Sequence, residues 1–380
     1  LSIRRQRQMC IRDSYWLVGM RGGEKVLEAL CDLYPDADIY THVVNRKAIS
    51  EKLLRHNIFT TFVAKLPFAE KIYQKYLPLM PLALEQLDLS DYDLVISSES
   101  GPAKGVITRP DALHVCYCHS PMRYIWDQYH VYISSAGRLV KTMFPWLSHK
   151  LRIWDVTSSS RVDYFIANSS AISLRIRKFY RRESVVIHPP CDIDTSDFTG
   201  VESGEKFYLM AGQLVRYKRP DLAIDAFVKM NKKLVVIGGG EEFERLKAQA
   251  NNSIKFLGRV DDQTLRNYYA SCEALVFPGE EDFGIVPVEV MAFGKPVIAL
   301  GRGGALDTVV DGVTGVFFKK DSVDSLIDAV ERFEIMKNEL DPEKIKLHAQ
   351  QFSTKSFLTK FQNFITVSYT HLTLPTNREV

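Results

Sequence analysis

The sequence predicts an α/β protein with two Rossmann-like domains, each built on a parallel sheet. Short apolar segments alternate with amphipathic helical segments from about residue 15 to residue 365, a pattern typical of parallel sheets. The chain has 380 residues, enough for two domains at roughly 150 residues each. Residues 188–205 combine Pro, Gly, Asp, Ser and Thr with little apolar periodicity, which indicates a boundary.

The individual elements follow from this alternation. In the first half we expect strands at 38–42, 94–97, 113–117 and 164–167, and helices at 23–33 and about 169–179. In the second half we expect strands at 207–211, 233–237, 254–257, 274–277, 296–299 and 315–318, and helices at 220–229, 241–249, 262–271, 286–292 and 322–333. The predicted parts are therefore a first domain at 15–188, a linker at 189–204, a second domain at 205–345 and a C-terminal helix within 346–366.

Both ends of the chain lack the period of a strand or a helix. Residues 1–14, LSIRRQRQMCIRDS, and residues 367–380 are therefore predicted to be foreign or disordered flanks outside the fold. Two native disordered termini are the alternative.

Composition excludes several classes of protein. Hydrophobic residues make up 46% and charged residues 25%, as in ordinary globular proteins, and the net charge of +3 gives no reason to expect a nucleic-acid partner. The six cysteines form no CxxC pair, which favours reduced, buried thiols over a zinc site or a disulfide framework. Without a long apolar run or a secretory leader, we expect a cytoplasmic protein.

The strongest motif runs from Glu281 to Glu289, EDFGIVPVE, between a predicted strand and a predicted helix. Gly284 would let the backbone approach a ligand, and Ile285 follows it into the helix, whose N-terminus suits a diphosphate. We place Glu281 in the loop and Glu289 in the first helical turn, where carboxylates can accept hydrogen bonds from sugar and ribose hydroxyls. Alternatively, Glu289 complements the helix dipole and Glu281 is a solvated charge.

A second set of candidates follows neighbouring strands. Lys218 and Arg216, in AGQLVRYKRPD, would stabilise charge on a leaving diphosphate, or would be solvated charges flanking a helix. Gly238 begins a run of three glycines that lacks the third glycine of a dinucleotide-binding fingerprint, so a nucleotide-contacting turn is the better interpretation.

EDFGIVPVE resembles the E-x7-E motif of retaining GT-B glycosyltransferases. The likeness extends over residues 207–318 and, more loosely, to GMRGGEKVLEAL and CYCHSPMRYIWD; the nearest subgroup is bacterial mannosyltransferase-like proteins of surface-polysaccharide assembly. The resemblance implies two domains facing across a cleft, with the donor on the second and the acceptor on the first. It implies transfer of a hexose, mannose as first guess, from a GDP- or UDP-linked donor to a glycan or polyprenyl-diphosphate-linked acceptor.

The resemblance also assigns roles to residues. Gly22 and Gly23 would form a phosphate-contacting turn before a helix. His119 would lie near the reacting centre, or would be a histidine with a purely structural role. Glu281, Lys218 and Arg216 would be catalytic, with no metal and no cofactor apart from the donor. Gln213 stands where the family usually has an arginine.

Further expectations concern the start of the chain, its basic segment and the alternative functions. The family begins with an apolar strand where this chain has MCIRDS, so we expect the natural gene to encode an apolar strand there and this chain to be less stable than the intact protein. Residues 131–184 are basic and aromatic, either an anionic-membrane surface at the inner face of the plasma membrane or a solvated face over a buried cluster. A nucleotide-sugar epimerase and a non-catalytic nucleotide-sugar-binding regulator stay open as alternatives.

Overall fold

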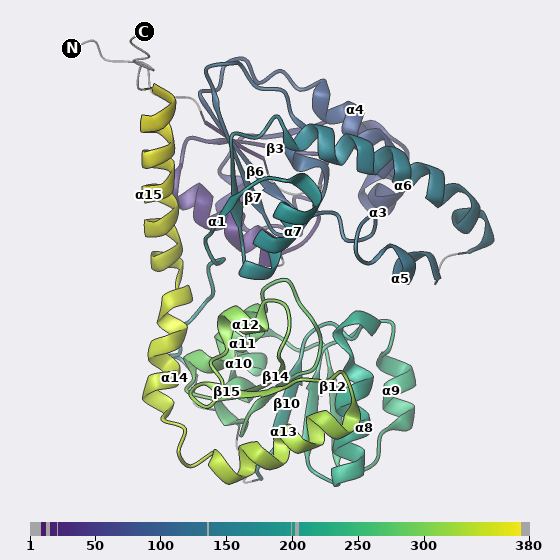
Figure 1. Cartoon of the computed structure of the whole chain (residues 1–380), viewed down its shortest axis with the longest axis vertical. Coiled ribbons are helices and arrows are strands. Elements are labelled where there is room, and N and C mark those ends of the chain that lie inside the picture. The colour runs from purple at the N-terminus through teal and green to yellow at the C-terminus, as the bar shows by residue number, and fades with distance from the viewer. Residues whose placement is uncertain are drawn as a thin grey trace. The chain divides into compact units, whose positions relative to one another are not determined.

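The fold is described from a computed structural model that covers residues 9–12, 16–20, 22–134, 137–198, 200–201 and 205–373. The chain forms two compact units, one comprising Leu1–Pro190 and Phe357–Val380 and the other Cys191–Ser356 (Figure 1). The division at Pro190 falls inside the stretch where the sequence predicts a boundary. Each unit carries its own parallel sheet, as the alternating pattern predicts.

The second unit contains a six-stranded sheet in the order β12-β11-β10-β13-β14-β15. All of its strand pairs are parallel, and the central strands are buried because helices cover such a sheet. The strand order reverses between β10 and β13, which creates the crevice where open α/β sheets bind ligands. The strands are β10 (Tyr208–Ala211), β11 (Leu234–Ile237), β12 (Ile254–Gly258), β13 (Leu275–Phe277), β14 (Val297–Leu300) and β15 (Gly315–Phe318).

The helices of the second unit alternate with these strands, as expected from the apolar periodicity. Most bounds lie within two residues of the predicted ones, since capping residues such as Ser322 and Asp261 mark the helix starts. They are α8 (Pro220–Met230), α9 (Phe243–Gln249), α10 (Asp262–Ser271), α11 (Ile285–Ala292), α12 (Ala305–Thr308), α13 (Val323–Met336) and α14 (Pro342–Ala349), with short 3-10 turns η4 (Arg216–Lys218) and η5 (Gln350–Phe352).

The first unit contains a seven-stranded parallel sheet in the order β5-β3-β1-β6-β7-β8-β9. Here too the strand order reverses, between β1 and β6. The strands are β1 (Met9–Arg12), β3 (Asp38–Thr41), β5 (Ile58–Thr60), β6 (Leu94–Glu99), β7 (Leu113–Cys118), β8 (Tyr164–Ala167) and β9 (Ser184–Val186), and β2 (Trp16–Leu17) pairs separately with β4 (Val43–Val44).

The helices of the first unit are less regular. Several are short, and the sequence analysis missed them because their apolar residues span too few turns to show a helical period. They are α1 (Gly22–Leu33), α2 (Glu51–Leu54), α3 (Ala69–Ile72), α4 (Met80–Glu85), α5 (Tyr129–Ser134), α6 (Arg138–Ser159) and α7 (Ser170–Tyr180), with 3-10 turns η1 (Phe62–Lys65), η2 (Tyr73–Leu79) and η3 (Pro102–Gly105).

Strand β1 corrects the interpretation of residues 9–12 as a flank outside the fold. Met9–Arg12 pairs with β3 on one side and with β6 on the other, in the interior of the sheet. Backbone groups make this pairing, so the absence of apolar periodicity did not prevent it. Residues 1–8 and 13–15 lie outside the described residues.

The C-terminal helix corrects the second predicted flank. Helix α15 runs from Thr354 to Thr373, beyond the expected end at residue 366. Its residues Phe357, Phe361 and Ile365 are buried in the core of the first unit, and the Tyr369 hydroxyl donates to the Asp93 carbonyl at 3.0 Å. The helix therefore returns to the first unit, and its extension packs there. Residues 374–380 lie outside the described residues.

Two simpler findings concern cysteines and membrane spans. The cysteines for which the structure describes burial, Cys31, Cys116, Cys118, Cys191 and Cys272, are all buried free thiols, as predicted. Among the described helices, none combines the length and the apolar character needed to cross a membrane.

Candidate functional site

The carboxyl ends of β10 and β13 bring together two of the predicted residues. Lys218 lies in the loop after β10, and Glu281 lies in the loop after β13. The Lys218 Nζ and Glu281 Oε1 atoms are 2.9 Å apart, and both side chains keep about a quarter of their surface exposed, 23% and 22%. The topology thus joins residues far apart in the sequence at the crevice where the strand order reverses.

Two glycines hold these loops together. A Cβ on Gly279 would come within 2.5 Å of the Lys218 Cα, so only glycine lets the two loops approach this closely. On the other side, the Gly304 backbone N–H donates to the Glu281 carbonyl at 2.8 Å. Neither position was predicted from the sequence, although GGA after one strand and PGE after another indicate close backbone packing.

The groups around Lys218 keep its side chain protonated. Burial has the largest single influence and would lower the pKa of Lys218, but the nearby charges and the hydrogen bond to Glu281, with the Glu281 charge first among them, together raise the pKa above the usual value. The side chain therefore carries a full positive charge at neutral pH while a negative partner is within reach. A ligand phosphate could compete with Glu281 for this ammonium group.

A small cavity adjoins the pair. Gln213, Lys218 and Glu281 are among its lining residues. The position where the resembling family usually has an arginine is thus part of the site, but it carries a neutral amide. Gly238 supports the same loop: its φ is +136°, and a Cβ there would lie 1.8 Å from the Gly212 carbonyl oxygen.

Arg216 lies in a separate hollow of about 370 Å³ rather than in the lining of this cavity. Its Nε atom is 3.1 Å from Glu242, whose carboxylate also accepts from Arg245. A hydrogen bond from Arg245 lowers the pKa of Glu242, followed by one from Arg216. Arg216, which was expected to be catalytic, therefore does not line the cavity beside Lys218 and Glu281.

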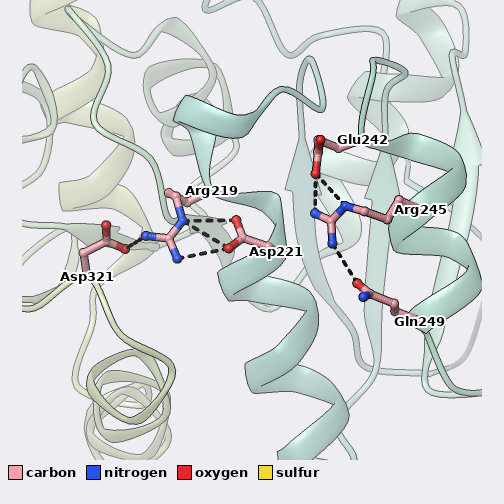
Figure 2. A network of polar contacts seen from close by, with 6 residues as sticks. All are labelled: Arg219, Asp221, Glu242, Arg245, Gln249 and Asp321. Atoms are coloured by element: carbon pink, nitrogen blue, oxygen red, sulfur yellow. Dashed lines mark hydrogen bonds and ion pairs between the residues drawn. The ribbon is translucent and has the colours of Figure 1, made fainter. Parts of the chain in front are cut away.

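Arg219 does not replace the absent arginine either. Figure 2 shows it between Asp221 and Asp321, with Asp221 accepting from the guanidinium at 3.0–3.2 Å. The same figure shows Arg245 between Glu242 and Gln249. Because these arginines are held by fixed acceptors, Lys218 is the cation that faces Glu281.

The expected position of Glu289 in the first helical turn is wrong. Helix α11 begins at Ile285 after Gly284, whose φ is 93°, so Glu289 belongs to the second turn. Its side chain is buried and accepts from the Tyr269 hydroxyl at 3.4 Å. Burial, followed by the charge of Glu289, raises the pKa of Tyr269. Gly284 and Ile285 do stand at the helix N-terminus, as predicted.

The other predicted residues belong to the first unit. His119 follows β7 at the carboxyl edge of that sheet, where its Nε2 atom lies 2.8 Å from the Ser98 hydroxyl. Burial lowers the pKa of His119 to about 4, so the ring is neutral at pH 7. Gly22 and Gly23 form the first residues of α1 rather than a turn before it, because the helix begins one residue earlier than expected.

A buried ion pair in the first unit escaped the sequence analysis. Lys104 and Asp155 form it with both side chains fully enclosed, and Asp155 also accepts from Trp126 at 2.7 Å and from Tyr180. A lysine in a short turn and an aspartate in a basic helix give no sequence signal of pairing. Within the described residues, no group of three or more His, Cys, Asp or Glu side chains is arranged to hold a metal ion.

Comparison with known families agrees with this geometry. Residues 193–352 match glycosyl transferases group 1, and residues 20–195 match Glycosyltransferase Family 4. The chain is 30% identical over 333 residues to the alpha-1,3/1,6-mannosyltransferase ALG2 of Dictyostelium discoideum, covering 72% of this chain and 75% of that protein. The chain therefore belongs to the group 1 glycosyltransferase family.

Other relatives are similar over shorter stretches. An uncharacterized glycosyltransferase of Methanocaldococcus jannaschii is 33% identical over 143 residues, which cover 35% of this chain and 37% of the relative. A second one from the same organism is 31% identical over 159 residues, or 45% of its length. The chain thus spans less than half of these two relatives.

Solved structures share the fold at low identity. Anabaena HepE in complex with UDP has a TM-score of 0.66 and 17% identity, covering 95% of this chain and all of that one. The sucrose-phosphate synthase of Thermosynechococcus elongatus has a TM-score of 0.72 and 16% identity, covering 96% and 100%. These likenesses confirm the GT-B fold class, with two parallel-sheet Rossmann-like domains.

Proposed function

We propose that this chain is a retaining hexosyltransferase that uses a GDP- or UDP-linked sugar, with GDP-mannose as the first candidate. The observation that carries the proposal is the Lys218–Glu281 pair at the carboxyl ends of β10 and β13. The printed name of the Dictyostelium relative, a mannosyltransferase, favours mannose, and the UDP bound to the Anabaena structure favours a nucleotide donor.

The proposed chemistry follows from the charges. The sugar–phosphate C–O bond breaks, an acceptor oxygen bonds to the same face of the sugar carbon, and the acceptor proton passes to a departing phosphate oxygen. Lys218 and the N-terminus of α11 at Gly284 and Ile285 stabilise the negative charge that grows on the diphosphate. Glu281, once Lys218 turns to the phosphate, accepts hydrogen bonds from sugar hydroxyls. We propose no metal and no cofactor beyond the donor.

We further propose a glycan or polyprenyl-diphosphate-linked acceptor and peripheral contact with an anionic membrane. Helices α5 and α6 support this contact. They expose Tyr132, Met143 and Trp146 beside the basic Arg138 and Lys141. We call the exposed residues Val131, Tyr132, Val140, Met143 and Trp146, together with Arg138, Lys141 and Lys150, the α5–α6 face.

The basic residues of α7 are less suited to this role than the sequence suggests. Arg175 is 14% exposed and pairs with Asp127 at 3.1 Å, and Arg177 pairs with Glu183. Neutralising Arg138, Lys141 and Lys150 should therefore reduce binding to anionic vesicles more than neutralising Arg175, Arg177 and Lys178. Vesicle co-sedimentation at low and high salt measures the difference, and equal binding to neutral vesicles contradicts membrane contact.

The experiment that tests the function is calorimetry of GDP, UDP and their hexose conjugates, followed by turnover with an acceptor panel in EDTA. In Glu281→Gln we expect nearly unchanged affinity for the free nucleotide and much slower transfer, because free nucleotide has no sugar to contact. Sugar interconversion without acceptor would instead show an epimerase, and tight donor binding without turnover a regulator. Loss of activity in EDTA with recovery on magnesium would contradict the metal-free mechanism.

A further inference from the structure

A hollow lined mainly by aromatic side chains lies in the first unit and contains none of the residues proposed to contact the donor. Its volume is about 400 Å³, within the range of small-molecule sites. Among the described residues, those that line it are uncharged: Trp16, Gln74, Leu77, Ser100, Tyr124, Tyr132 and Phe144. We call this hollow the aromatic groove. Its lining suits a hydrocarbon better than a phosphate or a free sugar.

The groove begins at the ligand-binding edge of the first sheet. Ser100 directly follows β6, and Ser98, two residues earlier, contacts His119 at the end of β7. Since ligands of open α/β sheets bind at the carboxyl ends of the strands, this end of the groove adjoins the position for reacting groups.

The opposite side of the groove belongs to helices α5 and α6. Tyr132 lies on α5 and Phe144 on α6, and both helices also carry the α5–α6 face. Tyr132 is itself half exposed, at 50%, and belongs both to the groove and to the α5–α6 face. The groove and the face therefore meet at Tyr132.

Helix α6 is anchored at its C-terminal half and exposed at its N-terminal half. Asp155 is held by Lys104 and Trp126, and the Trp154 indole donates to Glu85 at 2.9 Å. Figure 1 shows α6 running outward from the sheet of its unit toward α5. The only acidic residue of α5 and α6 is the buried Asp155, so the outer part of both helices presents only apolar, neutral polar and basic groups.

We propose that the aromatic groove holds the hydrocarbon chain of a lipid-linked acceptor, drawn from a membrane at the α5–α6 face. The inference rests on the proposed glycosyl transfer and specifies which part of the chain recognises the acceptor. Apolar lining provides affinity for the chain, and the basic residues of the face match the anionic phosphates of such lipids.

The test measures binding of geranylgeranyl monophosphate to the full chain, at concentrations below those at which the lipid forms micelles. Calorimetry and tryptophan fluorescence both monitor the binding. We expect saturable binding that inorganic phosphate, ethyl phosphate and methyl mannoside do not show at the same concentration. Phe144→Gln should weaken binding about tenfold or more, because one aromatic contact with the chain is lost. Tyr132→Ser, at a half-exposed position, should act in the same direction without disturbing the fold.

Leu174→Gln is the matched control, since Leu174 is 63% exposed on α7 of the same unit but does not line the groove. It should bind like the parent. Three outcomes would each overturn the proposal. In the first, Phe144→Gln and Tyr132→Ser bind the lipid as tightly as the parent does; in the second, the parent itself does not bind it; in the third, methyl mannoside binds in place of the lipid. Nucleotide affinity of the two groove variants, measured in parallel, should equal that of the parent, so a failure of donor binding is recognised separately.

Discussion

The first six strands of the seven-stranded sheet follow the same order as the six strands of the second sheet, but the loops after the central strands differ in chemistry. In the second unit the loops after β10 and β13 carry the ion pair of Lys218 and Glu281. In the first unit the edge formed by β6 and β7 carries serines and the neutral ring of His119, next to the aromatic groove. The same topology therefore supplies two crevices, and the side chains decide which part of a reaction each one suits.

The pKa directions express this contrast. Beside Glu281 the pKa of Lys218 rises in spite of burial, so the second unit keeps its charge. In the first unit burial lowers the pKa of His119 to about 4, so that ring loses its charge at neutral pH. The charged Lys218 favours a diphosphate, whereas the neutral ring of His119 and the aromatic groove favour an uncharged hydroxyl and an apolar chain.

The largest effect is expected from Lys218→Ala. Without its ammonium group the leaving diphosphate loses a preorganised positive charge, so turnover should fall about 100-fold or more. Steady-state transfer kinetics measure the loss. Lys229→Ala is the control, because Lys229 lies on α8 and pairs at the surface with Asp324. If Lys218→Ala turned over like the parent, the charge of Lys218 would have no role in the reaction, and the contrast between the two units would not be functional.

A smaller effect is expected from Glu289→Gln. If the buried carboxylate accepts a ribose hydroxyl, losing its charge should weaken nucleotide binding by about 1.5–3 kcal/mol. Tyr269→Phe removes the hydroxyl that donates to Glu289 and leaves the carboxylate in place. Calorimetry should therefore show a clearly smaller loss in Tyr269→Phe. Equal losses in both variants would indicate that Glu289 only supports the fold.

The difference between the units also explains what the sequence could predict. In the second unit β10 to β15 are short apolar runs with capped helices between them, and β15 and α10 were predicted to the residue. The proximity of Lys218 and Glu281 agrees with the sequence motifs, which predict that both residues contact the donor. The position of Glu289 did not, because the sequence marks the motif but not the residue at which the helix begins.

Fewer elements of the first unit could be predicted, because several of its segments show no apolar periodicity. Strand β1 is built by backbone pairing of residues that show no apolar alternation. The pairing of Lys104 with Asp155 joins a short turn to a long helix, and nothing in either segment identifies the partner. Long-range polar pairs of this kind depend on tertiary packing, which local pattern does not encode.

A third prediction concerns pH. His119 is neutral in the folded chain down to about pH 4, whereas in the unfolded chain it takes up a proton near pH 6.5. Between these values the unfolded state binds more protons, so the contribution of His119 to stability falls as the pH falls. The loss from pH 6.5 to pH 5 should be about 1.5 kcal/mol. Urea unfolding should show a shallower pH dependence in His119→Gln than in the parent, and identical slopes would contradict a neutral His119 ring in the folded chain.

The smallest effect is expected at the strand that the sequence analysis excluded. The backbone of Met9–Arg12 pairs with β3 on one side and with β6 on the other, so these residues keep an extended conformation. Valine has a higher strand propensity than arginine, so Arg12→Val should stabilise the first unit by up to about 1 kcal/mol, which thermal unfolding measures as a higher midpoint. The same change at Arg46, an exposed residue in a turn, should leave the midpoint nearly unchanged. An unchanged or lower midpoint in Arg12→Val would mean that β1 contributes little to the sheet, and that the first unit depends instead on the packing of α15 through Phe357 and Phe361.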